Sequence, residues 1–307
     1  MKRIGLLMML VAVPHAAAQP LAGYPAALDT IQVQGYRLVY HDSRTAGPPV
    51  VLVHGLGTNL SIWRAVVPLL RRKARVLALD LPGFGLSDKH NVPATPSFYA
   101  EVLVSWLDAL GLRQVDLIGL SMGGQIALTL ALRHPARVRR LVLAAPAGIE
   151  TFTPEAAAQL KLLFTAEAIE AMPPALYAQN VQRNFAHWDP DRFGWLLQQR
   201  EQMQRRADFR AYAEANARAI AGMLDEPVFA RLPEVSHPTL VVFGEDDQLI
   251  PNRLFRPTET PADILQVALQ RLPEAQGILI PHAGHLLVLE QPEVFAQQVL
   301  RFLFGTF

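Results

Sequence analysis

Short apolar runs alternate with longer amphipathic stretches along most of the sequence, and this alternation limits the possible folds more than any other feature. The run at 50–53 (VVLV) is typical of a strand buried on both faces, and similar runs occupy 75–79, 115–118 and 138–144. Between them, 98–110 carries its apolar residues on one helical face. Repeated alternation of this kind predicts an α/β fold, a mostly parallel doubly wound sheet with helices on both faces.

Other segments add detail to this pattern. The apolar stretches at 30–33 and 37–40 flank a glycine and predict an opening antiparallel hairpin. Residues 63–70 predict a helix, and Thr153 followed by proline predicts a helix start. Residues 192–224 predict a long helical stretch of mixed charge, broken only by weak turns.

Buried strand runs stop near residue 148 and resume near 239, which indicates an insertion within one α/β domain. The length of 307 residues is compatible with one domain carrying such an insertion. We predict a signal peptide at 1–18, the first part of the α/β core at 19–147, a helical cap at 148–234 and the second part of the core at 235–307.

The first residues match a secretory signal peptide. Lys2 and Arg3 precede an apolar run from Ile4 to Val13, and an alanine-rich stretch ending at Ala18 supplies a cleavage site. The apolar run is too short to cross a bilayer core as a helix. We therefore expect cleavage near Ala18 and an exported protein, periplasmic or secreted, without a stable membrane span.

Composition excludes several chemistries. The sequence contains no cysteine, which removes disulfides, thiolate zinc sites, iron–sulfur clusters and cysteine nucleophiles. Its 28 Lys and Arg nearly balance 27 Asp and Glu, so the net charge of +1 provides no field that would recruit nucleic acid. Any catalysis must use oxygen and nitrogen side chains. We expect no metal, no other cofactor and no nucleic-acid partner, and the oligomeric state stays open.

A G-x-S-x-G motif carries the chemistry. In the segment 119–124 (GLSMGG), Ser121 lies between a predicted strand and a predicted helix, where bulky neighbours would clash. Such a turn exposes the hydroxyl and points the helix N-terminus at developing negative charge. The structural alternative is an ordinary glycine-rich turn. The flanking strand and helix favour the interpretation of Ser121 as a nucleophile.

With this motif the sequence resembles the α/β-hydrolase fold family over nearly the whole chain after the leader. The matching segments, in the family's order, are HGLG at 54–57, DLPGFGLSD at 80–88, GLSMGG at 119–124, GEDD at 244–247 and HAGH at 282–285. The resemblance implies a catalytic triad in the chain order serine, acid, histidine.

The resemblance also implies the acid of the triad. In the family this acid lies three residues after the glycine that ends a buried strand and four before a proline. Gly244 and Pro251 both select Asp247, and Asp246 is the alternative. Such a carboxylate holds the imidazole in one tautomer and stabilises the imidazolium.

The base and the oxyanion hole follow from the same comparison. His285 lies where the family carries its base, and its Gly-His spacing fits better than that of His282. A serine needs such an imidazole to take its proton, so activity should fall as acid protonates His285. The backbone N–H of Met122, which follows the nucleophile, and by resemblance that of Leu56 should stabilise the oxyanion.

A serine nucleophile leaves several reactions open within the family. Because export exposes an enzyme to esters and lipids from outside, we expect an exported serine hydrolase that cleaves carboxylic esters, as an esterase or a lipase, through an acyl-enzyme. The alternatives are a C–C bond hydrolase of the meta-cleavage type and a non-catalytic binding protein on the same fold. The segment 252–261 is longer than the family leads us to expect. It forms either a rim over the acid loop or an exposed excursion.

Overall fold

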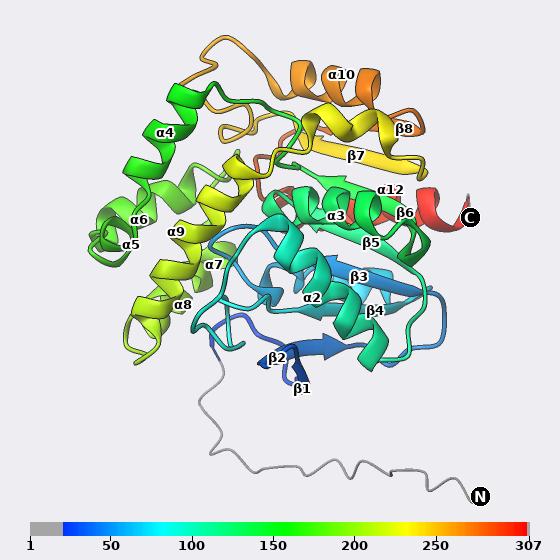
Figure 1. The fold of residues 1–307 in the computed structure, drawn as a ribbon, viewed down its shortest axis with the longest axis horizontal. Coiled ribbons are helices and arrows are strands. Elements are labelled where there is room, and N and C mark those ends of the chain that lie inside the picture. Colours follow the sequence, from blue (N-terminus) through cyan, green and yellow to red (C-terminus); the bar gives the residue numbers. More distant parts are fainter. Residues whose placement is uncertain (1–20, 306–307) are drawn as a thin grey trace, which may run out of the picture.

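A computed structural model describes residues 21–305, so the predicted signal peptide at 1–18 lies outside the described residues. Eight strands form one sheet in the order β1-β2-β4-β3-β5-β6-β7-β8 (Figure 1). The strands are β1 (Asp29–Val33), β2 (Tyr36–Asp42), β3 (Pro49–Val53), β4 (Arg75–Leu79), β5 (Val115–Leu120), β6 (Val138–Ala144), β7 (Thr239–Gly244) and β8 (Ala275–Ile280). Only the β1–β2 and β2–β4 pairs are antiparallel, which confirms the mostly parallel sheet and the opening hairpin.

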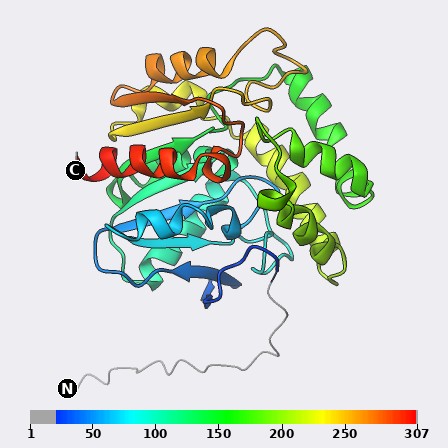
Figure 2. The ribbon, with the colours of Figure 1, turned by 180° about the vertical axis from the view of Figure 1, so that it is seen from behind.

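Helices cover both faces of the sheet, as the alternation predicts. The α2 helix (Pro96–Ala109) and α3 (Met122–Arg133) lie on the face seen in Figure 1, and α10 (Pro261–Arg271) packs on β7 and β8. The α1 helix (Val67–Leu70), α11 (Leu287–Glu290) and α12 (Pro292–Phe304) lie on the face seen in Figure 2. Phe295, Val299 and Leu303 recur at intervals of four and are buried, so α12 covers the sheet with one apolar stripe.

The helix predicted at 63–70 is wrong in its bounds. The structure has a 3-10 helix, η1 (Leu60–Trp63), followed by the short α1. The side chain of Asn59 accepts a hydrogen bond from the Ser61 N–H and so begins the turn earlier than the apolar pattern indicates. Pro68 occupies the first turn of α1, where its missing N–H is tolerated, and this starts a separate helix.

Between β6 and β7 the chain forms helices only. They are α4 (Pro154–Leu163), α5 (Ala166–Glu170), α6 (Pro174–Gln182), α7 (Pro190–Phe193), α8 (Trp195–Gln204), α9 (Phe209–Asp225) and η3 (Phe229–Glu234). Helices α4 to α9 gather at one side of the sheet, on the left in Figure 1, and we refer to residues 148–234 as the cap. Within residues 21–305, no helix is both long and apolar enough to cross a membrane.

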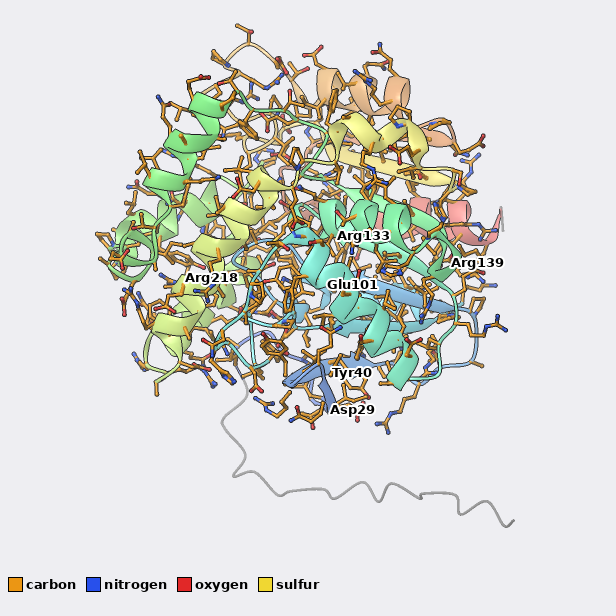
Figure 3. All side chains as sticks on the ribbon, viewed as in Figure 1. Asp29, Tyr40, Glu101, Arg133, Arg139 and Arg218 are labelled. Atoms are coloured by element: carbon orange, nitrogen blue, oxygen red, sulfur yellow. The ribbon has the colours of Figure 1, made fainter. Side chains whose placement is uncertain are left out.

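The two helices on the front face are joined through a shared carboxylate. Glu101 of α2 accepts hydrogen bonds from Arg133 of α3 and from His134, each at 2.9 Å to the same oxygen (Figure 3). The three side chains are partly exposed, so this cluster contributes little to stability. It connects α2 to the last residue of α3, the helix that begins directly after Ser121.

Asp80 joins three segments at the end of β4. The carboxylate is fully buried, and one oxygen accepts the Leu60 N–H at 2.8 Å. The other oxygen accepts the Leu86 N–H and the Tyr24 hydroxyl, both at 2.7 Å. Burial raises the pKa of Asp80 to about 6, while the two amide hydrogen bonds oppose that shift. Asp80 therefore holds the loop after β4 against η1 and against the segment around Tyr24.

We expect Asp80→Ala to destabilise the protein by about 3 kcal/mol, because it leaves two amide groups and a hydroxyl without their acceptor. Asp80→Asn should cost less, since its amide oxygen can still accept the Leu60 N–H. Asp108→Ala, at a carboxylate whose side chain is 64% exposed, is the control and should change stability by no more than about 0.5 kcal/mol. The measurement is urea unfolding, and equal midpoints for Asp80→Ala and Asp108→Ala would contradict this role.

Candidate active site

Ser121 lies in a strained turn between β5 and α3. Its φ of 53° is rare for a residue with a side chain. A Cβ at Gly119 would lie 2.2 Å from the Gly123 oxygen, and one at Gly123 would lie 2.2 Å from the Val53 oxygen. Only glycine fits at both positions, so the motif is explained by close backbone contact. The turn leaves Ser121 partly exposed at the carboxyl ends of the strands.

Asp247 and His285 are paired by a hydrogen bond. Nδ1 of His285 lies 2.8 Å from Oδ2 of Asp247. The other oxygen, Oδ1, accepts the Leu249 N–H at 2.7 Å and the Ile250 N–H at 3.1 Å. Asp247 is fully buried, whereas Asp246 is exposed to solvent. Two backbone amides hold one oxygen of this buried carboxylate in place, and the other oxygen fixes the orientation of the imidazole.

The three residues predicted as a triad follow three parallel strands of one sheet. Ser121 follows β5, Asp247 follows β7 and His285 follows β8, so all lie at the same edge. The structure brings Asp247 and His285 into contact. Within residues 21–305, the Ser121 hydroxyl forms no hydrogen bond, and such contacts often tighten only when substrate binds. His282, the alternative base, is exposed.

The predicted oxyanion turn, residues 54–57, passes beside Ser121. A Cβ at Gly55 would lie 3.2 Å from the Ser121 Cβ. The Leu56 N–H donates to no acceptor within the described residues, and Met122 begins α3, where the first N–H groups lack helical acceptors. Both amides that the sequence predicts for the oxyanion hole are therefore free to donate to a ligand.

His54 braces this turn and has no free ring nitrogen. Its Nδ1–H donates to the Gly55 carbonyl at 2.8 Å, and its Nε2 accepts the Leu81 N–H at 3.1 Å. Burial lowers the pKa of His54 to about 4, so the ring stays neutral at physiological pH. His54 thus acts as a structural link between the ends of β3 and β4.

A small polar pocket lies between the oxyanion turn and the cap, and the sequence did not indicate it. It is lined by Gly57, Asn59, Gly85, Tyr177, Gln199, Arg200, Met203 and Tyr212. The Tyr212 hydroxyl donates to the Gly57 carbonyl at 3.1 Å, which connects α9 of the cap to the turn. The pocket, of about 20 Å³, therefore lies against Gly57 at the end of the predicted oxyanion turn.

Arg200 contributes a buried positive charge to this pocket. It is 6% exposed, donates to the Ile169 carbonyl at 2.7 Å, and its Nε has no hydrogen-bond partner. The guanidinium lies over the rings of Tyr177 and Phe209, at 4.9 and 4.5 Å from their centres. Within residues 21–305, no carboxylate oxygen lies within 4.0 Å of it. A buried cation without an acid would be stabilised by an anionic ligand.

The segment 252–261 packs on the chain just after β6. Glu150 accepts the Asn252 N–H at 2.7 Å, and Arg256 donates to the Thr151 carbonyl at 2.7 Å. The rings of Phe255 and Phe152 meet edge to face at 6.1 Å. This segment is thus anchored to the chain after β6, while Leu254 within it is 65% exposed.

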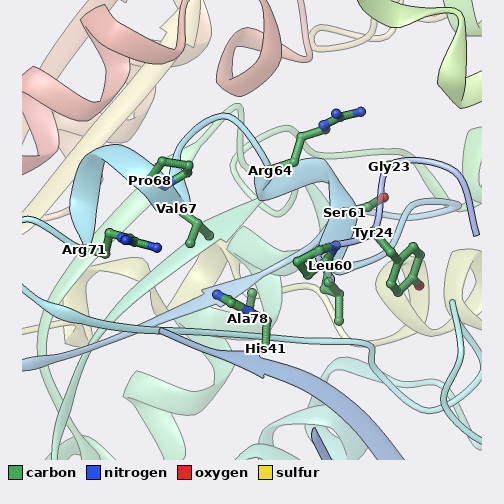
Figure 4. A pocket seen from close by; sticks show the side chains of 11 residues that line it. Gly23, Tyr24, His41, Leu60, Ser61, Arg64, Val67, Pro68, Arg71 and Ala78 are labelled. Carbon is green, nitrogen blue, oxygen red and sulfur yellow. The ribbon is translucent and has the colours of Figure 1, made fainter. Parts of the chain in front are cut away.

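Another pocket, of about 280 Å³, lies away from the predicted triad (Figure 4). It is formed by the start of the described chain, β2, η1 and α1, and is lined in part by Tyr24, His41, Arg64 and Arg71. None of the predicted site residues lines it. Over the residues described, no group of three or more His, Cys, Asp or Glu side chains is placed to hold a metal ion.

A serine in a strained strand–helix turn, a buried Asp–His pair and a neighbouring turn with a free amide define a hydrolase-type site on an α/β sheet. A family model described as the alpha/beta hydrolase fold matches residues 48–292. The chain belongs to the alpha/beta hydrolase fold family.

Curated relatives and solved structures share this fold at moderate identity. The chain is 33% identical to a 2-hydroxymuconate semialdehyde hydrolase from Pseudomonas sp. (strain CF600), over 88% of this chain and 91% of the relative. It is 31% identical to a 2-hydroxy-6-oxo-6-(2'-aminophenyl)hexa-2,4-dienoic acid hydrolase from Metapseudomonas resinovorans, over 84% of each. A thermophilic esterase from Thermogutta terrifontis is 28% identical with a TM-score of 0.75, over 91% of this chain and 98% of the esterase.

Stability should depend on pH through Glu150. Burial raises the pKa of this carboxyl from 4.5 to about 7, so the folded state favours the neutral acid. The resulting stabilisation is fully present below pH 4.5 and is lost as pH rises through 7. Glu150→Gln cannot ionise and keeps an acceptor for Asn252. Its unfolding free energy relative to wild type should therefore rise over this range, by up to about 3 kcal/mol.

The measurement is urea unfolding at several pH values. Glu245→Gln, at an exposed carboxylate on the acid loop, is the control and should follow the wild-type curve throughout. A difference between Glu150→Gln and wild type that stays flat or falls with rising pH would refute the assignment.

Proposed function

We propose that this hydrolase cleaves a carbon–carbon bond in a 2-hydroxy-6-oxo-dienoate, a substrate that carries a carboxylate. The observation that carries the proposal is Arg200, a buried guanidinium beside the predicted oxyanion turn that has no acid partner among the described residues. Relatives at 33% and 31% identity are hydrolases of such compounds by name, which supports the same substrate class. The relatives favour this reaction over the ester hydrolysis expected from the predicted export.

The proposed reaction acts on the 2-oxo tautomer of the substrate, which forms when the proton of the C2 hydroxyl moves to C5, and it begins at the C6 carbonyl. Ser121 Oγ adds to that carbon while His285 takes the hydroxyl proton, and Asp247 stabilises the imidazolium. The N–H groups of Leu56 and Met122 hold the oxyanion. In the 2-oxo tautomer, the C5–C6 bond then breaks and its electron pair is delocalised from C5 onto the oxygen at C2.

The second half restores the enzyme. The imidazolium of His285 returns its proton to the departing dienolate, which leaves as a 2-hydroxydienoate. Water then attacks the Ser121 ester with His285 again as base, and the carboxylic acid product leaves. Water is the only co-reactant, so atoms and charge balance without a cofactor.

Arg200 favours binding of this anionic substrate class over binding of neutral esters. The carboxylate and the C2 oxygen gather negative charge as the C5–C6 bond breaks, and a guanidinium can bind two such oxygens at once. The cost of keeping Arg200 buried without an acid is offset when that anion is bound. A neutral ester provides no such compensation.

Carboxylic ester hydrolysis is the second candidate. Ser121, His285 and Asp247 would perform it in the same way, with an alcohol as leaving group. The esterase at 28% identity supports it, as does the predicted export of the chain. The two candidates differ in what binds at Arg200, which a substrate comparison can test.

We expect the protein to hydrolyse 2-hydroxy-6-oxohepta-2,4-dienoate with a kcat/KM at least about 100-fold above that for p-nitrophenyl esters from acetate to palmitate, because Arg200 favours the anion. Loss of dienoate absorbance and release of p-nitrophenol provide the two rates. Ser121→Ala should reduce both by about 1000-fold or more. A preference for esters would support the second candidate, and unchanged turnover in Ser121→Ala would exclude the serine mechanism.

Arg200→Met should raise KM for the dienoate by about 10- to 100-fold, since it removes a charged hydrogen-bond donor. Turnover of neutral p-nitrophenyl acetate should change by less than about threefold, because that ester has no anionic group to bind. Arg205→Met, at an exposed position of the same region, is the matched control. Equal losses on both substrates would mean that Arg200 only supports the cap.

A further inference from the structure

Glu290, at the end of α11, links the cap to the loop that carries His285. Its buried carboxylate accepts three backbone N–H groups. Oε2 accepts from Gly284 at 2.8 Å and from Ala186 at 3.1 Å, and Oε1 accepts from His187 at 2.7 Å. Gly284 directly precedes His285, whereas Ala186 and His187 belong to the cap segment between α6 and α7.

The same cap segment contacts the other side of His285. The Leu286 N–H donates to the Asn184 carbonyl at 3.0 Å. A Cβ at Gly284 would lie 2.6 Å from that oxygen and 2.8 Å from the Ala186 nitrogen, so the two backbones are in close contact. The residue after His285 is therefore held by cap segment 184–187. The residue before His285 is held by the Glu290 carboxylate, which also binds that segment.

A third contact joins the cap to α11 itself. Arg192 of α7 donates to the carbonyls of Leu289 and Glu290, at 3.3 and 3.2 Å. Within residues 21–305, no cation lies within 4.0 Å of the Glu290 carboxylate, so its charge is balanced by amide dipoles. Hydrogen bonds to a carboxylate are stronger than those between neutral groups, and these three converge on one side chain.

We propose that Glu290 is a positioning residue that makes the placement of His285 depend on the seating of cap segment 184–187. The carboxylate binds the histidine loop and the cap segment at the same time, so neither moves without loss of a charged hydrogen bond. When the segment is seated, the backbone on both sides of His285 is fixed and its ring stays against Asp247. This inference rests on the catalytic role proposed for His285.

The test compares Glu290→Gln and Glu290→Ala with wild type. Glutamine has the same shape, but its NH₂ group cannot accept an amide N–H, so at least one of the three hydrogen bonds is lost. Glu293→Gln, at an exposed acid on α12, is the matched control. The readout is the second-order rate at which a fluorophosphonate labels Ser121, because this reaction needs His285 and no particular substrate.

We expect labelling to slow by about 10- to 100-fold in Glu290→Ala, since small displacements of a catalytic group cost rate on this scale. Glu290→Gln should fall between Glu290→Ala and wild type, and Glu293→Gln should match wild type. The kcat for dienoate and for ester should fall by the same factor, whereas loss of Arg200 affects the anionic substrate selectively.

A second measurement separates positioning from general loss of structure. Hydrogen exchange in Glu290→Gln should increase together at residues 184–187 and 283–286, while the strands of the sheet keep wild-type protection. Faster exchange in only one of these two segments would overturn the coupling between cap and histidine loop.

The possible failures are distinct. If wild type is labelled and both Glu290 variants are labelled at the wild-type rate, this inference is wrong and the serine mechanism stands. If wild type is labelled no faster than Ser121→Ala, the serine mechanism is wrong, and the role of Glu290 is wrong with it.

Discussion

The close backbone contact around Ser121 is the constraint on which the rest of the site depends. A side chain at Gly123 would collide with the carbonyls of Val53 and His54, at 2.2 and 2.7 Å. Glycine lets the first turn of α3 lie directly on the end of β3. The residues after β3 are the predicted oxyanion turn, and a Cβ at Gly55 in this turn would lie 3.2 Å from the Ser121 Cβ. The predicted nucleophile and the predicted oxyanion turn are therefore positioned by the same packing.

The buried charges around the predicted site are paired in two different ways. Asp80, Asp247 and Glu290 are buried carboxylates, and each accepts hydrogen bonds from at least two backbone amides of loops that border the site. These charges are satisfied by the protein itself and hold loops in place. Arg200 differs, because its guanidinium donates to one carbonyl and lies over aromatic rings, and no acid of residues 21–305 lies within 4.0 Å of it. A buried charge that the protein leaves incompletely paired is more informative about a ligand than about stability.

Local patterns predicted what depends on local sequence. Apolar runs predicted the strands, the G-x-S-x-G motif predicted the glycine turn at Ser121, and the resemblance to the family selected Asp247, which is buried. They did not reveal Arg200, because its surroundings come from Gly57, Tyr177 and Tyr212, which are distant in sequence. Glu290 was missed for the same reason, since two of its three donors belong to the cap. The bounds of η1 and α1 also escaped prediction, because the Asn59 cap and Pro68 outweighed the apolar periodicity.

The sequence motifs favoured no single reaction because they all lie in the core, whereas the residue proposed to select the substrate lies in the cap. Ser121, Asp247, His285 and the two amides predicted for the oxyanion hole lie outside the cap, and the reaction proposed for them suits acyl transfer from an ester or from a ketone alike. Arg200 belongs to α8 in the cap, where no family motif reaches. A cap that supplies the cation and also contacts the backbone on both sides of His285 would link substrate choice to catalysis. Under the proposed function, specificity depends on residues whose partners are set by tertiary packing, and the chemistry depends on residues that short motifs identify.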